Sequence, residues 1–230
     1  MLRIKNVSLS YGKQAVIQNL SLDIAVGTVC GLVGLNGSGK TTLINGLYGL
    51  KAMSSGEITL NDRPLTKNDV AYLETSNFFY SYISGREYLR LFKLQHPAFD
   101  IDGWNQLFDL PLDRYTEQYS TGMKKKLAFM GIVALDRPVL ILDEPFNGVD
   151  LETTQKLKII IKALRERGKT IVLTSHILES LTSLCDSISY LENQRIQHTF
   201  DRTAFADMEE TIFKNFTAEN ERTIKKLMDG

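Results

Sequence analysis

The sequence predicts an α/β fold with a mostly parallel sheet, an antiparallel β region at the N-terminus and an inserted α-helical subdomain. Three observations predict this fold. Short, continuously apolar segments, typical of strands buried on both faces, alternate with longer amphipathic segments. Apolar residues recur at period two over residues 2–26. From residue 75 to 119 the alternation is interrupted by a stretch rich in aromatic residues, glycines and prolines.

The N-terminal segment, residues 2–26, is expected to form antiparallel strands. Its apolar side chains keep largely to one face, and residues 11–13 (Tyr-Gly-Lys) supply a turn. Residues 28–33 are expected to form the first strand that is buried on both faces. A glycine-rich segment follows, with a helix beginning near Lys40 and a further strand over residues 57–60.

The middle of the chain, residues 75–119, is expected to form a small helical subdomain that continues into the next helix. It interrupts a core made of residues 1–74 and 120–200. Its aromatic residues are Phe78, Phe79, Tyr80, Tyr82, Tyr88, Phe92, Phe99, Trp104 and Phe108. We expect these side chains mainly to pack in the subdomain's core, with an interface role as the alternative.

The second half returns to alternating helices and strands. We expect a helix over 122–135, a strand over 139–142, a helix over 152–167 and a strand over 170–174. Strands that alternate with helices imply a largely parallel sheet, and such sheets bind ligands at the carboxyl ends of their strands. The functional residues are therefore expected just after these strands.

The C-terminal stretch, residues 201–230, is predicted to be a helical extension of a single domain spanning residues 1–230. Its apolar residues, which include Phe205, Met208 and Ile212, are spaced as in an amphipathic helix. Capping the core is the favoured role of this helix. Regulation and dimerisation are the alternatives.

Composition restricts the partners and the compartment. Lys+Arg and Asp+Glu both total 27, so the balanced charge does not favour nucleic acid as a partner. Cys30 and Cys185 lie outside any metal-ligand spacing and indicate a reducing, cytoplasmic compartment. Residues 1–6 show no signal-peptide core, and no stretch is long and apolar enough to span a membrane.

A phosphate-binding loop is predicted between the strand 28–33 and the helix near Lys40. Residues 34–42 match the P-loop pattern G-x-x-x-x-G-K-[ST]. Glycines let the backbone approach phosphate closely, and consecutive N–H groups point at the anion. Lys40 would contact the β- and γ-phosphates during catalysis, and the Thr41 hydroxyl would ligate Mg²⁺. The predicted nucleotide-binding residues are Gly34, Leu35, Asn36, Gly37, Ser38, Gly39, Lys40, Thr41 and Thr42. The alternative is a glycine-rich turn without a ligand.

Two acidic residues follow the strand 139–142. Asp143 would hold Mg²⁺, and Glu144 would orient or deprotonate the water that attacks the γ-phosphate. Alone, such a pair could equally be a solvated turn at the end of a strand. Its combination with a P-loop favours the catalytic interpretation.

A second anion site is predicted where Ser120, Thr121 and the Gly122 backbone open a helix. This stretch, Tyr-Ser-Thr-Gly-Met-Lys-Lys-Lys-Leu over residues 119–127, resembles the signature motif of ABC ATPases, usually LSGGQ. Thr121 replaces the first glycine and Met123 the glutamine. The Ser-x-Gly-Met form resembles that of ATPases serving ABC-2 type exporters. The resemblance implies the P-loop nucleoside triphosphatase fold for nearly the whole chain.

Three consecutive lysines, residues 124–126, follow the signature motif. We interpret them as a solvated helix face. The alternative is that they bind phosphate.

Other residues match the family's order. Tyr11 resembles the aromatic residue that stacks on adenine, although it could also be an ordinary edge-strand tyrosine. Residues 147–150 resemble the D-loop, in which Asp150 would contact the partner subunit. Asp150 could also N-cap the following helix. His176, just after the strand 170–174, resembles the switch histidine that senses the γ-phosphate.

One residue expected from the resemblance is missing. The family usually has a glutamine after the strand equivalent to residues 70–73, where it contacts Mg²⁺ and relays to the membrane partner. This chain has Glu74-Thr75-Ser76 there. Thr75 occupies the glutamine position without a gap, whereas Glu74 is the better ligand chemically, so both are candidates for the metal site.

The resemblance implies an ATP-hydrolysing subunit of a transporter, with ATP and Mg²⁺ as cofactors. It implies a head-to-tail dimer, expected to be a homodimer, that sandwiches two ATP molecules. A separate integral-membrane permease, expected to be an exporter, would hold the chain at the cytoplasmic face of the cell membrane. One alternative is a soluble ABC ATPase without a permease, for example in cluster assembly. Another is a P-loop kinase or GTPase, which would not explain residues 120–127 and His176.

Overall fold

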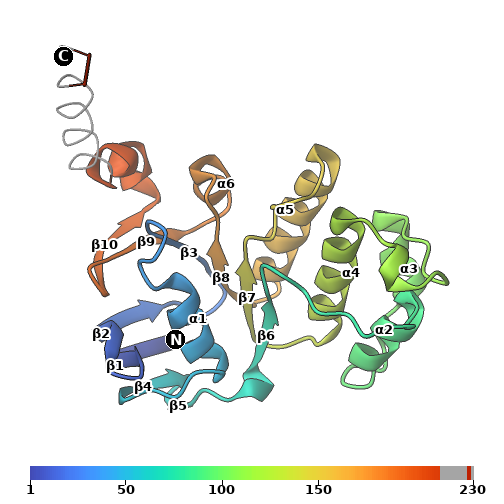
Figure 1. Ribbon diagram of the computed structural model, residues 1–230, viewed down its shortest axis with the longest axis horizontal. Coiled ribbons are helices and arrows are strands. Elements are labelled where there is room, and N and C mark those ends of the chain that lie inside the picture. The colour runs from blue at the N-terminus through green and yellow to red at the C-terminus, as the bar shows by residue number, and fades with distance from the viewer. Residues whose placement is uncertain (213–226, 229–230) are drawn as a thin grey trace.

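The computed structural model describes residues 1–212 and 227–228 (Figure 1). Within these residues, no helix is both long enough and apolar enough to cross a membrane. The predicted C-terminal extension therefore lies partly outside the described residues, from residue 213 to 226 and at residues 229 and 230.

An antiparallel sheet forms the N-terminal β region, as predicted. It contains β1 (Leu2–Tyr11), β2 (Gln14–Ile24), β4 (Ser55–Leu60) and β5 (Arg63–Pro64), in the order β2-β1-β4-β5. Gly12 has φ +57° in the turn between β1 and β2, a conformation that glycine adopts without strain.

A six-stranded sheet carries the second half of the fold, in the order β10-β9-β3-β8-β7-β6. All its neighbouring strands are parallel except β9 and β10, so the prediction of a mostly parallel sheet is confirmed. Its strands are β3 (Val29–Val33), β6 (Val70–Leu73), β7 (Val139–Asp143), β8 (Thr170–Thr174), β9 (Ser187–Glu192) and β10 (Arg195–Asp201). The carboxyl ends of β3, β6, β7 and β8 consequently share one edge.

Two hydrophobic cores lie on opposite faces of this sheet. In β7, Val139 and Ile141 face the core that contains α1 and the antiparallel sheet, whereas Leu140 and Leu142 face the other core. Successive side chains of a strand point to opposite faces, so a strand covered on both faces is apolar at every position. This arrangement explains the continuously apolar segments of the sequence.

The helices surround the six-stranded sheet. They are α1 (Lys40–Tyr48), α2 (Gly85–Lys93), α3 (Ile101–Phe108), α4 (Thr121–Ala134), α5 (Leu151–Glu166) and α6 (Leu178–Thr182). Short 3₁₀ helices are η1 (Lys67–Asp69), η2 (Thr116–Gln118) and η3 (Arg202–Ala204). In Figure 1, α2, α3 and α4 gather at the opposite end of the molecule from the antiparallel sheet.

The inserted segment is helical, as α2 and α3 show. A capping box begins α2: the Ser84 side chain accepts a hydrogen bond from the Glu87 N–H, and the Glu87 carboxylate accepts one from the Ser84 N–H. Tyr88, Phe99 and Phe108 are buried, which confirms core packing for these side chains.

The core-packing interpretation is wrong for three other aromatic residues of this segment. The exposed fractions of Phe78, Tyr80 and Tyr82 are 75%, 62% and 79%. They lie in the irregular stretch between β6 and α2, where no neighbouring element covers them. Periodicity could not separate them from the buried aromatic residues because this stretch has no regular period.

The C-terminal segment continues from β10 through η3 into a helical turn over residues 205–212. Met208 is 1% exposed and belongs to the core, and Ile212 packs against it. These contacts agree with a capping role for the described part. The predicted continuation through Phe213 and Phe216 lies outside the described residues.

Candidate functional site

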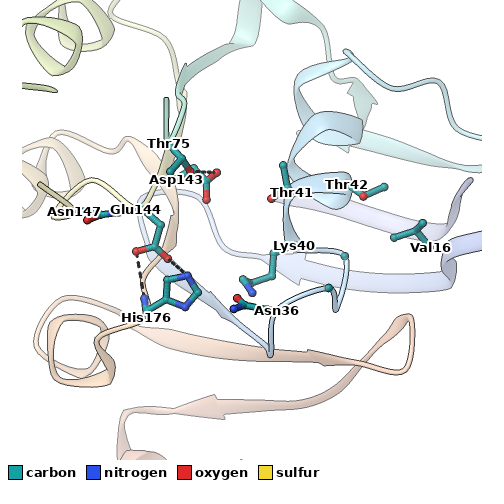
Figure 2. A pocket seen from close by; sticks show the side chains of 12 residues that line it. Val16, Asn36, Lys40, Thr41, Thr42, Thr75, Asp143, Glu144, Asn147 and His176 are labelled. Atoms are coloured by element: carbon teal, nitrogen blue, oxygen red, sulfur yellow. Dashed lines mark hydrogen bonds and ion pairs between the residues drawn. The ribbon is translucent and has the colours of Figure 1, made fainter. Parts of the chain in front are cut away.

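A cavity of about 310 Å³ opens at the carboxyl ends of the parallel strands. Residues 36–37 and 39–42 line one side of it. Thr75, Asp143, Glu144 and His176 line the other side, as Figure 2 shows. The structure thus brings together predicted site residues that lie up to 140 positions apart in the chain.

The predicted phosphate loop connects β3 to α1. Gly37 and Gly39 have φ angles of +80° and +104°, and a Cβ added at Gly37 would have no atom within 4 Å. This open backbone can approach a phosphate closely. A Cβ at Gly34, in contrast, would collide with the Leu191 carbonyl oxygen, so Gly34 is required by the packing against β9. Gly34, Leu35 and Ser38 lie outside the residues that line the main cavity.

Lys40 is the first residue of α1, and its side chain reaches back to the start of the loop. Its Nζ donates hydrogen bonds to the carbonyl oxygens of Gly34, at 2.7 Å, and Leu35, at 3.3 Å. Burial lowers the pKa of Lys40, and the charges of Glu144 and Asp143 act in the opposite direction. The ammonium group is therefore partly withdrawn from water beside two carboxylates, in position to attract a phosphate group.

Asp143, the last residue of β7, is held by two threonine hydroxyls. The Thr75 hydroxyl donates to Oδ2 at 2.7 Å, and the Thr174 hydroxyl donates to Oδ1 at 2.5 Å. Thr174 lies directly opposite Asp143 in the β7–β8 register, and its hydroxyl also accepts the Glu144 N–H at 3.0 Å. Each carboxylate oxygen keeps a further lone pair that can face the cavity.

Thr174 was not selected from the sequence, although it touches both acidic residues. A signal was present, because a polar residue ends the apolar strand 170–174 just as Asp143 ends its own strand. Recognising it requires knowing that these two strands are neighbours in register, and only the sheet order supplies that information.

Replacing Thr174 by valine is expected to lower the free energy of unfolding by about 1–3 kcal/mol, because the Glu144 N–H and Asp143 Oδ1 would lose a partner in the protein interior. ATP hydrolysis should fall as well, since the Asp143 carboxylate and the Glu144 main chain both lose a hydrogen bond. Urea unfolding and steady-state turnover measure these effects. Thr174→Ser is the control, because it keeps the hydroxyl group. Equal stability of the two variants would contradict the expectation.

Glu144 and His176 contact each other on the same side of the cavity. His176 N–H donates to Glu144 Oε2 at 3.3 Å, and His176 Nε2 lies 3.4 Å from Oε1 (Figure 2). Glu144 has φ +50°, which is uncommon for a residue other than glycine and is associated with functional sites. Its side chain is 12% exposed, and Oε1 has no hydrogen-bond partner among the described residues. A carboxylate with an unused oxygen at a cavity can orient a water molecule and accept its proton.

The donor set suits Mg²⁺. Figure 2 shows Thr41 and Asp143 facing each other across the cavity. The described residues contain no group of three or more His, Cys, Asp or Glu side chains that could hold a metal by themselves. Mg²⁺ does not need such a group, because it is usually bound through one or two carboxylates together with phosphate oxygens and water.

Of the two candidates after β6, the structure places Thr75 at the cavity and not Glu74. Thr75 lines the cavity and contacts Asp143, whereas the Glu74 side chain is exposed to solvent and does not line it. Glu74, the better metal ligand in chemical terms, is thus the candidate that does not reach the other predicted metal ligands.

Tyr11 lies outside the cavity, at the end of β1. It is 51% exposed, and Lys51 Nζ lies 4.1 Å from the centre of its ring. Adenine stacking by Tyr11 stays a prediction. Val16 of β2 is the residue from this hairpin that lines the cavity, and Asn147 does so from the loop after β7. Neither was selected as a site residue from the sequence.

The signature motif begins α4, as predicted. Ser120 is the N-cap, and its hydroxyl oxygen accepts the Met123 N–H at 3.2 Å. Neither Ser120, Thr121 nor Gly122 lines the cavity. A Cβ at Gly122 would lie 3.1 Å from the Gly148 carbonyl oxygen, so the signature motif packs directly on the D-loop of the same chain.

Asp150 caps α5, in agreement with the N-cap alternative. Its Oδ1 accepts the Thr153 N–H at 2.7 Å, and its Oδ2 lies 3.7 Å from Lys126 Nζ. The solvated-face interpretation of the three lysines is wrong for Lys125, which is only 4% exposed. The side chain turns inward because it finds carbonyl partners at the end of β6.

Comparisons with known proteins agree on one family. The family model described as ABC transporter matches residues 17–147. The lantibiotic transport ATP-binding protein SrtF of Streptococcus pyogenes is 31% identical over 210 residues, which cover 85% of this chain and 89% of that protein.

Solved structures show the same fold. The chain resembles an ATP-binding subunit of an ABC transporter with a TM-score of 0.83 and 26% identity, over 94% of this chain and 93% of that one. It also resembles an ATP-binding cassette solved as a dimer after hydrolysis, bound to ADP and Pi. There the TM-score is 0.78, the identity is 21%, and the match covers 88% of this chain and 99% of that one.

Proposed function

This chain belongs to the ABC transporter family, and we propose that it is the ATP-hydrolysing subunit that drives a separate membrane-embedded permease. The observation that carries the proposal is the convergence of Lys40, Asp143 and Glu144 on one cavity at the edge of a parallel sheet. A cation, a metal-binding carboxylate and a general base are the groups that phosphoryl transfer to water requires.

The chain's own groups bind and neutralise the triphosphate. The N–H groups at the start of α1 lie at the positive end of the helix dipole, where they would bind the phosphates. Lys40 exchanges its bonds to two loop carbonyls for phosphate oxygens. Thr41 and Asp143 would hold Mg²⁺, which supplies positive charge to the phosphate oxygens when it is bound.

Glu144 orients the attacking water and accepts its proton on Oε1, which accepts no hydrogen bond from the described residues. The His176 backbone N–H holds the other oxygen, Oε2, and so fixes the direction of the carboxylate. The His176 side chain is exposed to the cavity and can reach the γ-phosphate or Glu144 in turn. This arrangement supports the predicted sensing role of His176.

A second copy of the chain would complete the site. Ser120, Thr121 and Gly122 present an anion-binding helix start away from their own chain's cavity. A partner in head-to-tail orientation would bring this helix start onto the γ-phosphate, and Asp150 would lie in the contact. The dimeric cassette bound to ADP and Pi, which shares the fold, supports association as a dimer. Contacts of both subunits with the γ-phosphate would make ATP bind the dimer more tightly than the monomer. Hydrolysis removes the γ-phosphate, so the two subunits would then separate.

The exposed aromatic side chains support a permease partner. Phe78 and Tyr80 pack edge to face with a centroid distance of 5.2 Å, a few residues after the cavity residue Thr75. Exposed aromatic clusters are typical of protein interfaces. A relative named for lantibiotic transport supports a transport role. We expect export as the direction and the cytoplasmic face of the membrane as the location.

Association with membranes tests this function and separates it from a soluble ABC ATPase. We expect the native protein to sediment with membranes and to copurify with a hydrophobic subunit. The double variant Phe78→Ser/Tyr80→Ser should lose most of that association and still hydrolyse ATP in solution. The control is Ile159→Ser, at a 67% exposed residue on α5. A native protein that stays in the supernatant without a hydrophobic subunit would favour the soluble alternative.

A further inference from the structure

Lys125 is a buried cation whose partners are main-chain carbonyls. Its Nζ donates to the carbonyl oxygens of Thr75, at 3.0 Å, and Glu74, at 3.4 Å. Within the described residues it forms no ion pair with a carboxylate, and only 4% of it is exposed. Burying an ammonium group costs free energy unless hydrogen bonds compensate, so these two contacts account for its inward direction.

The peptide that Lys125 holds is the one that contacts the metal-binding carboxylate. The pairing of β6 with β7 ends at Leu73 and Leu142, so Thr75 lies beyond the sheet. Its hydroxyl nevertheless donates to Asp143 Oδ2 at 2.7 Å. Two hydrogen bonds in series therefore connect the α4 side chain of Lys125 with Asp143.

These contacts connect the signature helix with the metal-binding carboxylate, and they add to the packing of α4 against β6 in the hydrophobic core. The helix α4 begins at the signature residue Ser120, and Lys125 lies five residues further along, about 7–8 Å by the helical rise. Asp143 belongs to the six-stranded sheet. A displacement of α4 would therefore act on the Thr75 peptide, and the Thr75 hydroxyl contacts Asp143 Oδ2.

We propose that Lys125 is a positioning residue: it holds the Thr75 peptide, and Thr75 in turn orients Asp143, so that the position of the signature helix sets the affinity of the site for Mg²⁺. This inference rests on the proposed function, because Asp143 must hold the metal. The chain has threonine where the family usually has glutamine, and the short hydroxyl reaches the carboxylate itself.

The electrostatics of the site agree with this role. Burial lowers the pKa of Lys125, and the negative charges of Asp143 and Glu144 act against that effect. The cation thus lies within the field of both carboxylates without contacting either, so it can hold the main chain without occupying a lone pair that the metal would use.

The test measures Mg²⁺ dependence by binding and not by turnover. Affinity for a fluorescent ATP analogue is determined in Mg²⁺ and in EDTA, and the ratio of the two affinities is the readout. Lys125→Met should reduce this ratio about 10-fold or more, as expected when a residue that supports a metal ligand is lost. The matched control is Lys124→Met, because Lys124 is on the same helix and its side chain makes no hydrogen bond or ion pair with the described residues. Its ratio should be that of the wild type.

Variants of Thr75 test the second of the two hydrogen bonds, from the Thr75 hydroxyl to Asp143. Thr75→Val removes the hydroxyl and should reduce the ratio as much as Lys125→Met does, whereas Thr75→Ser keeps the hydroxyl and should restore most of it. The double variant Lys125→Met/Thr75→Val should be no worse than the poorer single variant, because both act through one path. Independent effects would multiply instead, to about 100-fold.

Two results would overturn the inference: a folded Lys125→Met protein with the wild-type ratio, or single effects that multiply in the double variant. If Lys125→Met does not fold, the comparison of Thr75→Val with Thr75→Ser decides, since Thr75 is exposed and its replacement leaves the buried site intact. Asp143→Asn separates this inference from the proposed function. If Asp143→Asn kept the wild-type ratio of affinities in Mg²⁺ and in EDTA, Asp143 would not be the metal ligand, and this conclusion would not depend on the result for Lys125.

Discussion

Glu144→Gln is expected to bind ATP as the wild type does and to lose hydrolysis by about 100- to 10,000-fold. Glutamine has the shape of glutamate, but it cannot accept a proton from the attacking water. The His176 N–H can still donate to the amide oxygen, so the position of the side chain should change little. The variant therefore separates binding from chemistry.

Such a variant should also accumulate as an ATP-bound dimer, because the γ-phosphate that joins the two subunits is not removed. Size-exclusion chromatography with light scattering in ATP and Mg²⁺ measures this population, and single-turnover kinetics measure the loss of hydrolysis. The control is Glu152→Gln on α5, where the exposed carboxylate pairs with Lys156 alone among the described residues. Unchanged turnover in Glu144→Gln would remove this residue from the role of general base.

Lys40→Met is expected to weaken ATP binding by roughly 30-fold to a few thousand-fold, the equivalent of about 2–5 kcal/mol for losing one partner of a desolvated charge pair. The physical reason is the charge of the cavity. Asp143 and Glu144 face the same space, so without the Lys40 ammonium a triphosphate would meet two carboxylates with less compensation.

Equilibrium binding of a fluorescent ATP analogue checks this expectation, in parallel with Lys162→Met. Lys162 is an exposed residue of α5 and carries the same charge away from the cavity. Similar affinities in the two variants would show that Lys40 does not contact the phosphates. Thermal unfolding of both proteins should be close to that of the wild type, because the loop carbonyls released by Lys40 can bind water.

The local motifs could be predicted from the sequence because their chemistry depends on neighbouring residues. The loop of residues 34–42 needs its glycines and lysine at fixed spacing, and the strand before Asp143 needs apolar residues at every position. The N-cap role of Ser120 was predictable for the same reason, since a helix start is a local feature.

Contacts between distant segments were harder to predict. The lysines of residues 124–126 have the same chemistry and adjacent positions, yet only Lys125 is turned toward the carbonyls at the end of β6. Their spacing alone cannot say which side of the helix meets the sheet. Likewise, Phe78 and Phe99 are the same residue type, but one is exposed and the other is buried.

The sequence by itself determined the α/β fold, the phosphate loop and the identity of the acidic pair, because hydrophobic period and motif spacing are properties of short segments. Only the tertiary structure decided that Thr174 contacts the Asp143 carboxylate and the Glu144 N–H, that Thr75 and not Glu74 reaches the cavity, and that Lys125 holds the Thr75 peptide. These contacts join residues 30 to 68 positions apart in the sequence. The order of the strands and the packing of the helices bring these residues together, and no short segment determines either of them.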